Sequence, residues 1–373
     1  MTRAPREPSK LDFSILDKAF KEIEKNMGED VVIDVNNFPV IPRIKLSSPM
    51  VGYITGEGGL PKGRIIEIRG KESSGKSLLA TVACADAQKQ GIFAAYIDME
   101  HAFSASFAKR IGLDTSKDKF RLFQPTTAEQ VFSIIELLAE TKQVGICVVD
   151  SVAAMTPLAE LEGDMEQQFM GIMARTIGKG LRKITGLVSK SGMVVLFINQ
   201  VREGLNPYGE KVVSPGGNAL KFFSSIRLEV NKSEQITGKN ADDVIGIRSK
   251  IKSIKNKTAA PFRKGVIEIY FDSGLNNFNE YVDFGITFGL IEKAGAWLTY
   301  KGERTQGKEK MSNLLKDRSD LFSTLQKEVD SKLSENKEAV LDVDTIDDDI
   351  EDEEEKKDED IISIASEALN VGE

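Results

Sequence analysis

Histidine and cysteine are nearly absent from this sequence, and their scarcity excludes several kinds of site. Among 373 residues there are one histidine and two cysteines. Because His101 is the single histidine, zinc sites built on several histidines and histidine-based catalytic triads are excluded. Cys84 and Cys147 stand among apolar neighbours and have no C-x-x-C partner, so we expect buried thiols in a reducing compartment.

Long apolar runs are missing as well. No stretch approaches the roughly 18 apolar residues that a membrane span needs, and the opening MTRAPRE lacks the apolar core of a signal peptide. With 40% hydrophobic and 29% charged residues, the composition is typical of a globular protein with one large core. The sequence therefore predicts a soluble, cytoplasmic protein without a membrane partner.

Negative charge is concentrated at one end of the chain, which the net charge of −8 conceals. Residues 341–360 hold thirteen Asp or Glu and two Lys, a net −11, and residues 361–373 add −2, so residues 1–340 carry +5. The acidic run has few aromatic residues, which is typical of disorder. A basic body with an acidic tail indicates a polyanionic partner, with which the tail would compete for the cations of the body.

One stretch, from Gly70 to Ser77, fits the phosphate-loop pattern G-x-x-x-x-G-K-S and lies between a β-branched strand and a helix-favouring run. Glycines let backbone N–H groups converge on phosphate oxygens at a helix N-terminus. Lys76 is expected to reach the β- and γ-phosphates, and the Ser77 hydroxyl to ligate Mg²⁺. The predicted nucleotide-binding residues are Gly70, Lys71, Glu72, Ser73, Ser74, Gly75, Lys76 and Ser77.

Carboxylates follow two of the apolar strands. Asp150 ends the run 146–150, the position from which an Asp holds the Mg²⁺ hydration shell in phosphate-loop NTPases. Glu100 follows the strand 94–98 and is our candidate general base for an attacking water. The alternative for Glu100 is a helix N-cap or a surface acid. His101, beside it, is expected to be structural or substrate-orienting.

Two polar loops are candidates for contact with nucleic acid. Gln200 follows the strand 193–199 and could sense the γ-phosphate. The loop 201–215 after it is polar and glycine-rich and holds Arg202, Tyr208 and Lys211. A similar insertion, 162–171, precedes a helix. Plain solvated loops are the alternative. The candidate contacts in and around these loops are Arg175, Arg182, Arg202, Tyr208, Lys211, Gly216 and Gly217.

Lys255 and Lys257 lie two apart on an extended segment and are expected to face the same side. Two adjacent ammonium groups repel unless an anion lies between them, so a phosphate, on this chain or a neighbouring subunit, would satisfy both. A solvated basic strand is the alternative.

Strands and helices alternate through the middle of the chain. This alternation, with near-continuous apolar strands, predicts an α/β fold whose mostly parallel sheet is covered on both faces. An amphipathic helix and short strand over Leu11–Ile33 would fold back or dock on another copy of the chain. We divide the chain into an N-terminal arm (1–37), a core (38–275), a small α+β domain (276–335) and an acidic tail (336–373). The strands are expected at 64–69, 94–98, 146–150, 193–199, 226–230, 245–251 and 266–271, and the helices at 77–90, 105–111, 128–141 and 171–190.

Together these segments resemble the bacterial RecA recombinase family over residues 11–315. The resemblance implies a RecA-type phosphate-loop core, ATP with Mg²⁺, and a DNA-dependent ATPase. It also implies helical filaments on single-stranded DNA, pairing with double-stranded DNA, and strand exchange in DNA repair and the SOS response. The most specific matches are GLPKGR (59–64), ESSGKS (72–77), IDMEHA (97–102), VDSVAA (149–154), FINQ (197–200), GGNALKF (216–222), KNKTAAPF (255–262) and EKAGAW (292–297).

The resemblance also implies roles for single residues. Glu100 matches the catalytic glutamate, and Gln200 the residue that couples the γ-phosphate to DNA binding. Phe107 stands where the family usually has a tyrosine that stacks on adenine. Lys255 and Lys257 match the pair that reaches ATP across the subunit interface.

Larger segments are assigned in the same way. Residues 162–171 and 201–215 match the two DNA-binding loops, and 11–33 matches the polymerisation arm. The unit after Asn276 matches the domain that captures duplex DNA, with Lys293 and Lys308 among its cations. We expect the tail at 341–360 to compete with duplex DNA for the cations around Lys293, Arg304, Lys308 and Lys310; a solubilising tail is the alternative.

The sequence departs from the family at a few positions. Ser77 replaces the usual threonine but keeps the hydroxyl, the second loop is slightly shorter, and the first loop has Gln167, Gln168 and Phe169 in place of its common residues. A ring-forming motor of replicative-helicase type and a non-catalytic DNA-coating filament are the other functions to consider. The arm and the paired lysines favour an open filament, since a head-to-tail contact that does not close makes a helix. Intact Lys76 and Glu100 argue against a non-catalytic role.

Overall fold

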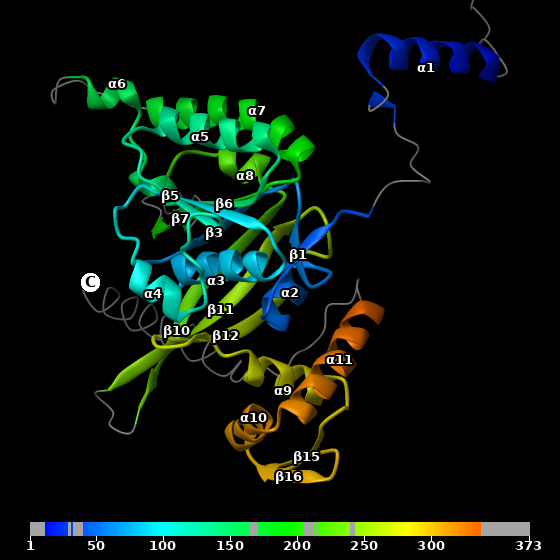
Figure 1. Cartoon of the computed structure of the whole chain (residues 1–373), viewed down its shortest axis with the longest axis vertical. Coiled ribbons are helices and arrows are strands. Elements are labelled where there is room, and N and C mark those ends of the chain that lie inside the picture. Colours follow the sequence, from blue (N-terminus) through cyan, green and yellow to red (C-terminus); the bar gives the residue numbers. More distant parts are fainter. Residues whose placement is uncertain are drawn as a thin grey trace, which may run out of the picture. The chain divides into compact units, whose positions relative to one another are not determined.

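The computed structural model describes residues 12–28, 31–32, 40–163, 171–203, 212–213, 215–238 and 243–336. The chain divides into two compact units, residues 1–42 and residues 43–373 (Figure 1). The predicted tail from residue 337 onward lies outside the described residues, as do parts of the arm and of both candidate DNA-binding loops. No helix in the described ranges is long and apolar enough to cross a membrane.

The N-terminal unit contains the predicted amphipathic helix, α1 (Phe13–Met27). The Asp12 carboxylate accepts a hydrogen bond from the Ser14 N–H and caps the helix, which ends at Gly28 with φ +100°. No residue of α1 is buried. The short strand expected after it is not seen at Val31 or Val32, because the Val31 N–H donates to the Gly28 carbonyl and closes a turn; Ile33 lies outside the described residues.

A nine-stranded sheet forms the centre of the second unit, in the order β13-β12-β11-β10-β3-β7-β6-β4-β5. The strands from β10 to β5 pair in parallel, whereas β10 to β13 pair antiparallel. The prediction of a mostly parallel sheet is confirmed. The strands are β3 (Ile65–Gly70), β4 (Phe93–Asp98), β5 (Phe120–Phe123), β6 (Val144–Asp150), β7 (Val194–Gln200), β10 (Ile226–Thr237), β11 (Val244–Asn256), β12 (Lys264–Tyr270) and β13 (Gly274–Leu275).

Helices cover both faces of this sheet, as the apolar strands predicted (Figure 1). Ile146 and Val148 of β6 belong to a core with α3, whereas Cys147 and Val149 belong to a second core with α5 and α7. Both predicted thiols, Cys84 and Cys147, are buried, and burial raises the pKa of Cys147 to about 12. The helices are α2 (Pro49–Thr55), α3 (Lys76–Lys89), α4 (Ala105–Arg110), α5 (Ala128–Thr141), η3 (Val152–Ala154), α6 (Leu158–Leu161), α7 (Ile172–Ser191) and α8 (Ala219–Phe223).

The hairpin of β10 and β11 is longer than the sequence indicated. Only Ile226–Glu229 of β10 pairs with β3, and the polar remainder pairs with β11 alone and extends beyond the parallel strands (Figure 1). Side chains there are largely exposed, so the apolar pattern that marks a buried strand is missing. Two smaller antiparallel pairs complete the core, β1 (Arg43–Lys45) with β2 (Gly59–Pro61) and β8 (Arg202–Glu203) with β9 (Val212–Val213).

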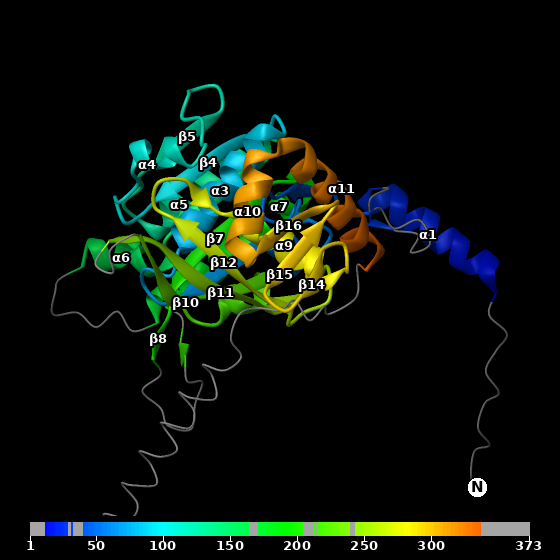
Figure 2. The ribbon, with the colours of Figure 1, turned by 90° about the horizontal axis from the view of Figure 1, so that it is seen from below.

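The small α+β unit after Asn276 is present, and Figure 2 shows its antiparallel strands beside its helices. Its core continues that of the sheet, since Tyr281 and Phe284 of α9 belong to the cluster that includes α3. The domain boundary at residue 275 therefore stays a prediction. The elements are α9 (Asn277–Thr287), β14 (Glu292–Ala294), β15 (Trp297–Tyr300), β16 (Glu303–Gln306), α10 (Lys308–Asp317) and α11 (Ser319–Glu335).

A buried carboxyl group joins α9 to α2. Glu280 is 2% exposed, and its Oε2 accepts hydrogen bonds from the Ser48 hydroxyl (2.6 Å) and the Met50 N–H (3.1 Å). Burial raises the pKa of Glu280 to about 8 from an ordinary 4.5. Between about pH 5 and pH 8 the folded chain therefore holds a proton here that the unfolded chain has released.

We expect this proton to make stability fall as pH rises. Between about pH 5 and 8 the unfolded chain binds fewer protons at this position, so each rise in pH favours unfolding. Glu280→Gln keeps an acceptor and cannot ionise. Relative to the variant, the wild type should lose about 2–4 kcal/mol over that range, measured by urea unfolding at each pH. Parallel stability curves for the two proteins would contradict the assignment.

Candidate functional site

The carboxyl ends of β3, β4, β6 and β7 meet at one edge of the sheet and border a cavity of about 540 Å³. Open α/β sheets bind ligands at this edge. Most of the residues predicted to contact the nucleotide and its Mg²⁺ line the cavity, whereas Gly70 and Lys71 begin the loop without lining it. The lining residues are Glu72, Ser73, Ser74, Gly75, Lys76, Ser77, Leu78, Glu100, Phe107, Asp150, Ile198, Gln200, Lys232, Gln235, Val244, Ile247, Ile269 and Phe271.

The loop from β3 to α3 has the geometry of an anion cradle. Gly75, at the N-cap of α3, has φ +90°, a conformation that side-chain-bearing residues rarely adopt. Lys76 opens the helix, and its Nζ donates to the Lys71 carbonyl at 2.5 Å. Burial lowers the pKa of Lys76, against the opposing effect of nearby carboxylates, first Asp150. A cationic group and a helix N-terminus thus lie at the same wall of the cavity.

Asp150 lines this cavity and is bound by a tyrosine, Tyr96, that no sequence pattern marked as part of the site. The Tyr96 hydroxyl donates to Asp150 Oδ2 at 2.6 Å, and burial raises the pKa of Asp150 while hydrogen bonds from Tyr96 and Ser77 lower it. Ser77 and Asp150 therefore bring two oxygen ligands together, the type that Mg²⁺ prefers. These residues fit a magnesium ion held with a nucleotide. Tyr96 reads as an ordinary core residue in the sequence, and only the pairing of β4 with β6 reveals its partner.

Glu100 and Gln200 come into contact. Gln200 Nε2 donates to Glu100 Oε1 at 3.1 Å, and the Ser151 hydroxyl donates to the same oxygen. Glu100 is not an N-cap, because Ser104 caps α4. The neighbouring Asp98 instead accepts hydrogen bonds from the N–H groups of residues 102 and 103, which holds the turn that presents Glu100. His101 is exposed and is not among the lining residues.

Aromatic and polar side chains form the outer part of the cavity. Phe107 of α4 lines it as expected, with the Arg110 guanidinium 5.6 Å from the centre of its ring. Lys232, Gln235 and Val244 of the long hairpin line it too. The expected strands omit all three residues, because β10 was expected to end at residue 230 and β11 to begin at residue 245.

Lys255 and Lys257 are not among the residues that line this cavity. The Lys255 ammonium donates to the carbonyls of Lys221 (2.7 Å) and Phe222 (3.1 Å) in α8. Burial, followed by the charge of Lys257, lowers the pKa of Lys255 to about 8. The two lysines therefore repel each other as expected, and the carbonyl groups at the C-terminal end of α8 partly compensate the charge of Lys255.

The candidate DNA contacts are described only in part. Arg175 and Arg182 are exposed on α7 and Lys293 is exposed on β14; Arg202 starts β8, but its side chain lies outside the described residues, as do Tyr208 and Lys211 entirely. Gly216 and Gly217 lie in the turn before α8. Lys308 Nζ pairs with Asp283 at 2.5 Å, and the Arg304 guanidinium lies 4.6 Å from the centre of the Trp297 ring.

Gly75→Ala tests the cradle. An added Cβ would lie 2.4 Å from Ile269 Cδ1 at φ +90°, so we expect the loop to reshape and nucleoside-triphosphate affinity to fall by at least about tenfold, measured with a fluorescent ATP analogue. Gly91→Ala is the matched control, because Gly91 has φ +74° and no neighbour within 4 Å of an added Cβ. Equal affinity losses in both variants would show that backbone strain alone is responsible.

The sequence comparisons agree with this geometry. The family model described as "RecA N-terminal domain" matches residues 14–276, and "RecA C-terminal domain" matches residues 279–334. Protein RecA of Mesomycoplasma hyopneumoniae (strain 7448) is 42% identical over 329 residues, 87% of this chain and 96% of the relative. Protein RecA of Thermus aquaticus is 43% identical over 321 residues, 84% of this chain and 93% of the relative. The chain therefore belongs to the RecA family.

Proposed function

We propose that this chain is an ATP-driven recombinase for DNA recombination and repair. In this proposal it is a DNA-dependent ATPase that forms helical filaments on single-stranded DNA, pairs them with homologous duplex and exchanges strands. The observation that supports it most directly is the hydrogen bond of 3.1 Å between Gln200 and Glu100, which line the same cavity as the phosphate loop. This contact joins the candidate general base to the residue that directly precedes the second candidate DNA-binding loop.

The residues of the cavity divide the work of hydrolysis. Loop N–H groups and Lys76 hold the β- and γ-phosphates, and Phe107 packs against the base. Ser77 and Asp150 hold Mg²⁺, which supplies positive charge to the phosphate oxygens when bound. Glu100 orients a water molecule and accepts its proton.

The residue before Gln200 connects the site to the second loop. Asn199 Nδ2 donates to the Pro215 carbonyl at 3.3 Å and to Glu67 Oε1 at 3.1 Å. Asn199 lies just before the loop 201–215, and Pro215 is its last residue. The hydrogen bond between them therefore holds the two ends of the loop together. A change of partner at Gln200, from Glu100 to a γ-phosphate, would move the residue that directly precedes the loop, whose ends are closely held. This is a direct route by which nucleotide could alter DNA binding.

The two lysines complete the site from another subunit. Because Lys255 and Lys257 do not line their own chain's cavity, we propose that they contact the nucleotide of a neighbouring subunit. That arrangement is a heterologous, head-to-tail interface, which gives an open helix or a closed ring according to its rotation.

Electron microscopy with single-stranded DNA and a slowly hydrolysed ATP analogue distinguishes the two assemblies. We expect helical filaments that require both DNA and nucleotide. Closed rings of fixed subunit number would contradict the proposal and favour a ring motor of helicase type.

Glu100→Gln tests the proposed base. The amide keeps the size of the side chain and loses the proton acceptor, so ATP and DNA binding should persist while DNA-stimulated turnover falls by about 10²–10⁴-fold. Glu136→Gln is a suitable control. Glu136 of α5 pairs with Lys183 of α7 and does not line the cavity. Unchanged turnover in Glu100→Gln would remove Glu100 from the mechanism.

A further inference from the structure

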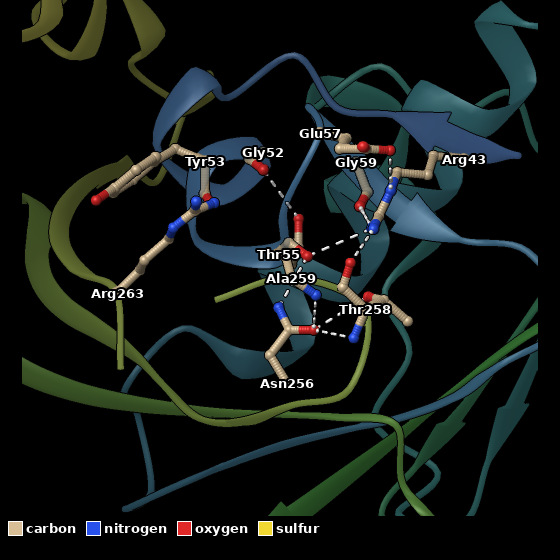
Figure 3. Close-up of polar contacts among 10 residues, drawn as sticks. All are labelled: Arg43, Gly52, Tyr53, Thr55, Glu57, Gly59, Asn256, Thr258, Ala259 and Arg263. Carbon is tan, nitrogen blue, oxygen red and sulfur yellow. Dashed lines mark hydrogen bonds and ion pairs between the residues drawn. The ribbon is translucent and has the colours of Figure 1, made fainter. Parts of the chain in front are cut away.

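The segment that follows β11 is irregular, and it carries Lys257. It runs from the end of β11 at Asn256 to the start of β12 at Lys264 and has no helix or strand of its own. Lys257 can serve a neighbouring site only if this segment keeps one shape, whereas Lys255 is held in β11 opposite Arg227. The contacts that give it that shape come from β1, α2 and the turn after α2, which begin the core in sequence (Figure 3).

Asn256 folds the segment back on itself. Its Oδ1 accepts hydrogen bonds from the Thr258 N–H (2.8 Å), the Thr258 hydroxyl (3.0 Å) and the Ala259 N–H (3.0 Å). Its Nδ2 donates to the Thr55 carbonyl, the last residue of α2, at 3.0 Å. The amide oxygen of Asn256 therefore holds the turn, and its amide nitrogen binds the turn to the end of α2.

Arg43 holds the same turn from β1. Its Nη2 donates to the Thr258 carbonyl at 3.1 Å, and its Nη1 donates to the carbonyls of Thr55 (3.3 Å) and Gly59 (3.0 Å). Its Nε donates to Glu57 Oε2 at 3.4 Å, and the side chain is 6% exposed. One guanidinium thus joins β1, the end of α2, β2 and the lysine segment (Figure 3).

Packing leaves the segment little freedom at these points. A Cβ added to Gly56, which has φ +97°, would lie 2.3 Å from Ala259 Cβ, so the two backbones are in close approach. At the far end, the Arg263 guanidinium lies 4.7 Å from the centre of the Tyr53 ring, and its Nη1 donates to the Tyr53 carbonyl at 2.8 Å. Both ends of the segment are therefore docked on α2 and the turn that follows it.

Lys257 lies between two of the held residues. Asn256 precedes it, Thr258 follows it, and its own N–H donates to the Ser225 carbonyl at 2.9 Å. The backbone of Lys257 is therefore held by its own hydrogen bond and by those of its two neighbours. Its side chain does not line the cavity of its own chain. A cation held in advance loses less entropy when it meets an anion than one on a mobile loop.

We infer that Arg43 is a positioning residue, which holds the Asn256–Ala259 turn so that Lys257 can reach a neighbouring subunit's nucleotide. This inference rests on the proposed function, which assigns the two lysines to that nucleotide. Arginine suits the position because its planar fork of five N–H groups serves three carbonyls and a carboxylate at once, which an ammonium group cannot do with the same geometry.

Three substitutions separate positioning from folding. Arg43→Met keeps an unbranched stem and loses every donor, Arg43→Lys keeps the charge, and Glu57→Gln alters only the weakest partner. Arg318→Met is the matched control, because Arg318 pairs with Glu303 and Asp320 in the C-terminal unit. We expect DNA-stimulated kcat to fall about ten- to a hundredfold in Arg43→Met, less in Arg43→Lys, and hardly in the other two, with ATP affinity of the isolated subunit unchanged.

Mixed filaments provide a measurement that general destabilisation would not reproduce. Wild-type chains are mixed in equal amounts with Glu100→Gln chains, which do not turn over but still offer their lysines. The ATPase rate per wild-type chain should then stay the same. With Arg43→Met/Glu100→Gln chains it should fall to about half, because each site draws on one neighbour and half of the neighbours lack a held turn.

A third mixture, with Lys257→Ala/Glu100→Gln chains, tells the two ideas apart. If the lysine variant lowers the wild-type rate and the Arg43 variant does not, the inference about Arg43 is wrong and the proposed function stands. If neither lowers it, the lysines do not act on a neighbour and both ideas fail. Fluorescently labelled chains measure incorporation, and Arg43→Lys/Glu100→Gln replaces the methionine variant if that variant does not co-assemble.

Discussion

The register of the parallel strands is the constraint on which the rest of this structure depends. β3 pairs with β7 so that Gly70 lies opposite Gln200, and β4 pairs with β6 so that Asp98 lies opposite Asp150. A slip of one residue would turn each strand's side chains to the other face, and here both faces carry buried cores. The packing that stabilises the sheet therefore also decides which strand ends, and which functional groups, meet at its edge.

A buried ion pair supports the same edge from within the sheet. Glu67 of β3 and Arg227 of β10 are cross-strand partners, 2.5 Å apart, with side chains 1% and 8% exposed. A buried charge is costly unless it is paired and hydrogen-bonded, and Asn199 adds a further bond to Glu67 at 3.1 Å. Asn199 also donates to the Pro215 carbonyl. The same polar cluster therefore holds both the strand that precedes the second loop and Pro215, the last residue of that loop.

The sequence predicted local structure well where a residue pattern is sufficient. The helix 128–141 is found with the same bounds as α5, and the phosphate loop lies between a strand and a helix as its pattern requires. It predicted poorly where the pattern is polar or the partner is remote. The hairpin of β10 and β11 was underestimated because its outer part buries few side chains, and the ion pair of Lys308 with Asp283 was not predicted.

The sequence by itself determined the fold class, the phosphate loop, the family and the identity of the acids and amides at the site, because each depends on residue type at a fixed spacing. Only the tertiary structure decided which of them touch. Tyr96 with Asp150, Lys255 with the end of α8, and Arg43 with Thr258 are contacts between residues 34 to 215 positions apart. Such contacts follow from strand order and from the packing of loops on the sheet, and no local pattern carries that information.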